Sequence, residues 1–95
     1  MNKEMVNEIN LSDIKKCFPE RAKLIPRRPS EGSRANGSYA IQVLCSPAMK
    51  DKEADYCMES VRQILPIKEF YSQSTGADIW IYWYFNKSLP ITFNI

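Results

Sequence analysis

The feature that most constrains the fold is one uninterrupted apolar run, from Ile79 to Phe85, with Asp78 before it and Asn86 after it. Every residue of the run is aromatic or β-branched, and these residue types favour strands. The run is far shorter than the roughly 20 residues that a membrane-spanning helix needs. It therefore predicts a strand over 78–86. One face would carry Ile79, Ile81, Trp83 and Phe85, and the other Trp80, Tyr82 and Tyr84.

The rest of the chain alternates between helix and strand patterns. A short helix should begin at Asn10, which would form a capping box with Asp13, and end at Pro19. A longer helix should begin at the Ser46-Pro47 pair and run to Leu65, with apolar positions at helical spacing that include Cys57 and Ile64. Further strands are expected at 21–26 (an edge strand), 38–45, 67–73 and 91–95, with Gly76 in a hairpin loop before the apolar strand.

This order of elements predicts the α+β class. We expect a mainly antiparallel sheet of about four to five strands with the long helix packed on one face and the short helix near the N-terminus. The 95 residues should form a single domain, 1–95. Residues 1–9 are expected to be flexible, and residues 26–38, rich in Arg, Gly and Ser, to form an exposed loop.

Catalysis is not expected. Histidine is absent, which excludes Ser-His-Asp and Cys-His nucleophile pairs, and no glycine-rich phosphate loop occurs. Asp55 and Glu59 could be offered as a carboxylate pair, but a solvated helix face explains them better. We therefore expect no enzyme activity, no cofactor and no metal.

Three cysteines, Cys17, Cys45 and Cys57, lie on the apolar sides of their predicted elements and form no CxxC pair. Buried, reduced thiols in a cytoplasmic protein fit this pattern best. A three-cysteine metal site completed by a carboxylate is the weaker alternative. The N-terminal residues have no apolar stretch typical of a signal peptide, and we do not expect the protein to bind a membrane.

A strand that is apolar on both faces must be buried by other residues on both faces. The simplest expectation is that Ile14, Cys17 and Phe18 cover the face that the long helix leaves open. The alternative is that a partner protein or a second copy covers it, because Tyr and Trp are enriched at interfaces. Candidate partner-binding residues are Trp80, Tyr82 and Tyr84 on the strand, together with Tyr56 on the polar face of the long helix.

Basic residues concentrate in residues 15–34, whose net charge is +5 in a chain of net charge +2. Such a segment favours contact with nucleic acid or with an acidic partner, although a solvated loop is the simpler interpretation. The candidate residues for this role are Arg21, Lys23, Arg27, Arg28 and Arg34.

The leading hypothesis is a small, non-enzymatic, cytoplasmic binding protein that acts by protein–protein interaction. Its size and lack of catalytic motifs would suit a phage or mobile-element inhibitor of a host system, an anti-CRISPR being one example. The alternative is a nucleic-acid-binding regulator that uses the basic segment 15–34. A homodimer is expected if the second aromatic face, or a C-terminal strand at a sheet edge, stays open.

Overall fold

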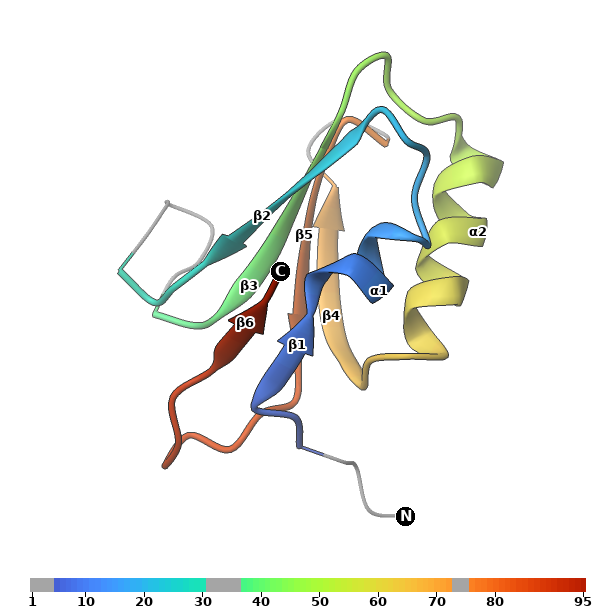
Figure 1. Ribbon diagram of the computed structural model, residues 1–95. Coiled ribbons are helices and arrows are strands. Elements are labelled where there is room, and N and C mark those ends of the chain that lie inside the picture. The colour runs from blue at the N-terminus through green and yellow to red at the C-terminus, as the bar shows by residue number, and fades with distance from the viewer. Residues whose placement is uncertain (1–4, 31–36, 73–75) are drawn as a thin grey trace.

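The α+β class predicted from the sequence is confirmed. The computed structural model describes residues 5–30, 37–72 and 76–95, with two helices and six strands in these ranges (Figure 1). Their bounds are β1 Glu8–Asn10, α1 Leu11–Lys15, β2 Ala22–Arg27, β3 Ala40–Cys45, α2 Asp51–Arg62, β4 Ile67–Ser72, β5 Asp78–Trp83 and β6 Thr92–Asn94. Neither helix of the described ranges is long and apolar enough to cross a membrane.

Four strands form an antiparallel sheet in the order β2-β3-β5-β4. The edge position predicted for residues 21–26 is confirmed by β2, and β4 forms the opposite edge. As expected, α2 lies against one face of the sheet (Figure 1). Its buried residues Cys57, Met58 and Val61 belong to the same core as Ile41 and Ile81 of the two central strands.

The C-terminal strand does not extend this sheet, which corrects our expectation. Instead β6 pairs in parallel with β1, and the two form a separate two-stranded sheet. Asn7 supports the pairing, because its side-chain Nδ2 donates to the carbonyls of Asn86 and Leu89, in the segment before β6, at 2.9 and 3.1 Å. Ile91, just before β6, is buried, whereas Ile95, just after it, is fully exposed. Residues 8 and 9 of the segment expected to be flexible belong to β1, and residues 1–4 lie outside the described ranges.

The long helix begins later and ends earlier than its sequence pattern predicts, at Asp51 and Arg62. The preceding segment bonds to other parts of the fold. The backbone N–H of Met49 donates to the carbonyl of Gly76 at 3.1 Å, and the carbonyl of Pro47 accepts a bond from Arg21 Nε at 2.9 Å. These tertiary contacts hold residues 46–50 outside the helix, so the prediction of an N-cap at Ser46 was wrong.

The capping box predicted for the short helix is also absent, although α1 does begin after Asn10. The Asn10 side chain makes no capping bond to α1. Its Oδ1 instead accepts a hydrogen bond from Asn94 Nδ2 of β6 at 3.0 Å. The Asn10 oxygen that could accept a bond from the first turn of α1 is therefore bonded to β6 instead.

The two faces of β5 are confirmed: Ile79, Ile81 and Trp83 pack in the main core, and Trp80 and Tyr82 pack with Ala40 on the other face. The expected cover for that second face was wrong. The short-helix residues Ile14 and Phe18 are buried in the main core, and Cys17 packs against it, on the side of α2. The reason is that β1 and β6 hold α1 on this side of the sheet (Figure 1).

Candidate functional site

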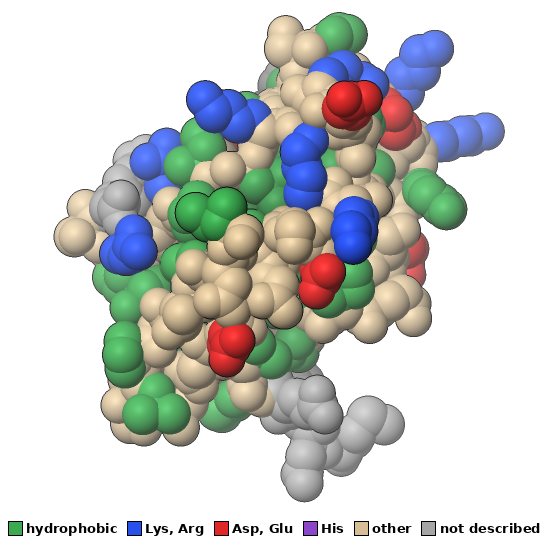
Figure 2. Space-filling model, in the orientation of Figure 1, with side chains coloured by type: hydrophobic (Ala, Val, Ile, Leu, Met, Phe, Trp, Pro, Cys, Tyr) green, Lys and Arg blue, Asp and Glu red, His purple; other side chains and the backbone are tan. Residues whose placement is uncertain are grey.

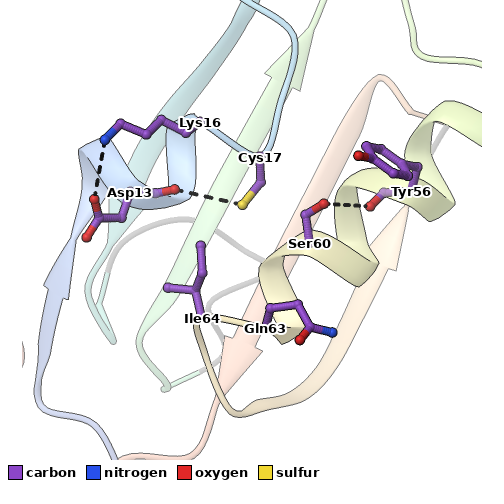
Figure 3. A pocket seen from close by; sticks show the side chains of 7 residues that line it. All are labelled: Asp13, Lys16, Cys17, Tyr56, Ser60, Gln63 and Ile64. Carbon is purple, nitrogen blue, oxygen red and sulfur yellow. Dashed lines mark hydrogen bonds and ion pairs between the residues drawn. The ribbon is translucent and has the colours of Figure 1, made fainter.

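An open groove lies between α1 and α2 (Figure 3). Its volume is about 440 Å³. The side chains of Cys17, Ser60 and Ile64 point into the space between the two helices (Figure 3). The full lining consists of Asp13, Lys16, Cys17, Tyr56, Ser60, Gln63 and Ile64.

Two large apolar side chains of this groove are exposed to solvent. Tyr56 is 74% exposed and Ile64 is 50% exposed, although side chains of this size are usually buried. Tyr56 was a predicted contact residue, whereas Ile64 was expected in the core. Ile64 is exposed because α2 ends at Arg62, so Ile64 no longer follows the apolar stripe of the helix.

The two charged residues that line the groove already form a pair with each other. Lys16 Nζ lies 3.8 Å from Asp13 Oδ1 at the exposed surface. Exposed pairs of this kind contribute only about 0–1 kcal/mol each. The groove is therefore close to neutral, and its free features are the Tyr56 ring and the Ile64 side chain.

The Cys17 thiol in the groove is not set up as a nucleophile. Its Sγ donates a weak hydrogen bond to the carbonyl of Asp13 at 3.8 Å. Burial and the nearby Asp13 carboxylate raise the pKa of this thiol, which keeps it protonated near neutral pH. Within the described ranges, no group of three Cys, Asp or Glu residues could hold a metal ion. The chemistry that this groove offers is recognition through apolar surface.

The sheet face opposite α2, which carries Trp80 and Tyr82, exposes much less aromatic surface than the groove does. Trp80 and Tyr82 are only 4% and 7% exposed, and Tyr84 is half-buried. The Arg27 guanidinium lies over the Trp80 ring, 5.8 Å from its centroid, and also donates to Gln42 Oε1 at 2.8 Å. The Trp80 Nε1 group is buried and has no acceptor among the described residues.

The structure therefore separates the four predicted contact residues into two groups. Tyr56 lies on α2 beside α1, whereas Trp80 and Tyr82 of β5 pack on the other side of the sheet. Tyr84 follows directly after β5. Of the four, Tyr56 exposes the largest fraction of its side chain. Sequence reasoning did not identify the groove itself, because no pattern in the chain indicates that α1 packs next to α2.

Comparison with protein-family models, with curated proteins and with solved structures finds no match to this chain.

The five predicted basic residues do not form one continuous, unpaired basic surface. Arg21 forms an ion pair with Glu53 at 3.1 Å, and Arg27 binds Gln42. The Arg28 guanidinium lies 5.9 Å from the centre of the Phe93 ring, Lys23 is exposed, and Arg34 lies outside the described residues. On the face drawn in Figure 2, Asp and Glu side chains lie among the Lys and Arg side chains. This mixture weakens the case for a continuous basic surface.

Proposed function

We propose that this chain is a non-enzymatic binding domain that contacts another protein through the groove between α1 and α2. The observation that carries the proposal is the exposure of Tyr56 together with Ile64 on one wall of that groove. Tyrosine is enriched at binding hot spots because it buries a large area and still carries a polar group. An inhibitory role in a phage or mobile element, as expected from the sequence, stays a prediction.

The groove has a rigid support, which favours binding. Tyr56 is followed directly by Cys57 and Met58, both of which are buried in the core. The helix therefore fixes the position of the Tyr56 backbone before any partner arrives. A surface that is already ordered loses less conformational entropy on binding, so more of the contact energy contributes to affinity.

The proposal is tested with the Tyr56→Ala variant. The wild-type chain, immobilised, is used to isolate a stoichiometric protein partner, and the affinities of both chains for that partner are then measured by calorimetry. If Tyr56 is a hot spot, its truncation costs about 2 kcal/mol, or roughly 30-fold in affinity. Because the side chain is exposed, circular dichroism and the urea midpoint should stay unchanged.

Lys52→Ala is the matched control, since Lys52 is exposed on the same helix but does not line the groove. It should bind the partner like the wild type. Equal affinity of Tyr56→Ala and the wild type would reject the groove as the binding surface. Failure to recover any stoichiometric protein partner would count against the protein-binding function itself.

A further inference from the structure

A second, smaller pocket lies between α2 and β4. Its volume is about 260 Å³, which is below the roughly 300–1,000 Å³ of sites for small-molecule ligands. A space of this size suits one long side chain better than a cofactor. The pocket is lined by Asp51, Ala54, Asp55, Met58, Phe70, Gly76 and Ile79.

The walls of this pocket differ sharply in polarity. Met58 and Ile79 are buried apolar residues, and the half-exposed ring of Phe70 stands beside them. Asp51 and Asp55 are exposed and lie one helical turn apart, so they are on the same side of α2. Neither carboxylate forms a hydrogen bond or an ion pair with any residue that the structure describes. The pocket thus combines an apolar floor with two unpaired negative charges.

The Phe70 ring already holds a guanidinium group within the molecule. The Cζ atom of Arg62 lies 5.6 Å from the centre of this ring, a distance typical of a cation–π contact. A second arginine entering the pocket would lay its methylene groups along the apolar surface that Ala54 and Phe70 expose there, as long cationic side chains do on apolar surfaces. Its guanidinium would then reach Asp51 and Asp55, because carboxylates are the strongest acceptors for that group.

The position of the pocket also suits an extended segment of a partner. β4 is an edge strand, since the sheet order ends at β4, and the pocket opens beside it. An unpaired strand edge can accept a further strand, whose alternate side chains then reach pockets next to the edge. Both the pocket and the edge therefore favour a peptide segment over a free small molecule.

We propose that the pocket between α2 and β4 binds an arginine side chain from an extended segment of the protein partner. The inference rests on the proposed function, because the partner supplies the arginine. The pocket is nevertheless separate from the groove with Tyr56, since the two share no lining residue. Together they would let a partner contact α2 from both sides.

The pocket is tested without any partner, by titrating the ¹⁵N-labelled chain with N-acetyl-arginine N-methylamide. N-acetyl-citrulline N-methylamide serves as the neutral probe of nearly the same shape. The arginine probe should shift the amide signals of Asp55, Phe70 and Gly76, and the citrulline probe should shift them much less. The Asp55→Asn variant should bind the arginine probe about two- to fivefold more weakly, as expected for an exposed charge pair.

Lys23→Gln, an exposed site on the opposite edge strand β2, should bind the probe like the wild type. Equal responses to arginine and citrulline, signals that shift only outside the pocket, or no response at all would each overturn the inference. Unchanged affinity in Asp55→Asn would overturn it as well. If Tyr56→Ala abolishes partner binding while the arginine probe does not shift the amide signals of the pocket, the proposed function stands and this inference fails.

Discussion

The burial of the three cysteines follows the prediction from the sequence for two of them and departs from it for the third. Cys45 and Cys57 are buried at 4% and 3% exposure, as the apolar sides of their elements predicted, and all three cysteines are free. Cys17 is only half-buried, which corrects the prediction for that residue. It lines the groove between the helices, so one side of its thiol lacks packing partners. Burial within an element therefore depends on how closely its neighbours pack.

The Cys57 thiol should make stability depend on pH. Burial, and then the nearby Glu53 carboxylate, raise its pKa above the ordinary value of 9.0. Below that value the thiol is protonated in both states. Above it the unfolded chain loses the proton first, so the free energy of unfolding falls as the pH rises. We expect urea midpoints at about pH 7 and about pH 10 to differ more for the wild type than for Cys57→Ala. Equal pH dependence in the two proteins would contradict this assignment.

Among the turns and elements, the loop before β5 is the most tightly constrained. Gly76 lies in the loop between β4 and β5, as predicted, and has φ +69°, a value that glycine adopts readily. A β-carbon there would meet the backbone oxygen of Met49 and would lie 2.6 Å from the Met49 Cβ. The Met49 N–H also bonds to the Gly76 carbonyl. This close approach joins the segment before α2 to the turn that leads into β5.

Gly76→Ala should therefore destabilise the fold more than Gly37→Ala. Gly37 is the matched control, because its φ is also positive, at +77°, but a β-carbon there would meet nothing within 4 Å. Both variants lose the freedom of glycine at positive φ, and only Gly76→Ala adds a clash with the Met49 backbone. The additional loss should be about 1–3 kcal/mol, measured by urea denaturation. Equal losses in both variants would show that Met49 can move away.

At the scale of the whole molecule, the charges do not favour nucleic acid. The net charge is only +2, and Arg21 and Arg27 already have partners within the fold. We expect no shift of duplex or single-stranded DNA probes at about 150 mM salt. Binding whose logarithm falls with the logarithm of salt, and which Lys23→Glu with Arg28→Glu abolishes, would contradict this and support the alternative regulator.

Much of the sheet could be predicted from the sequence because strand alternation records which residues face the core. The two faces of β5 and the strand β3 followed from that alternation. For the candidate site, only Tyr56 could be named, as an aromatic residue on a polar helix face. The opposite wall of the groove comes from α1, and its place beside α2 has no signal in local periodicity.

What the chain determined by itself is which face of an element turns toward the core, as in the apolar stripe of α2 and the two-faced strand β5, and where a glycine is needed in the turn before β5. Tertiary structure decided where α2 begins, which strand β6 joins and which side of the sheet α1 occupies. The physical reason is the sequence separation of the contacts involved. Asn7 bonds to Asn86 and Asn10 to Asn94, at separations of 79 and 84 residues. Local periodicity shows that a face must be covered, whereas such distant hydrogen bonds and core contacts select the element that covers it.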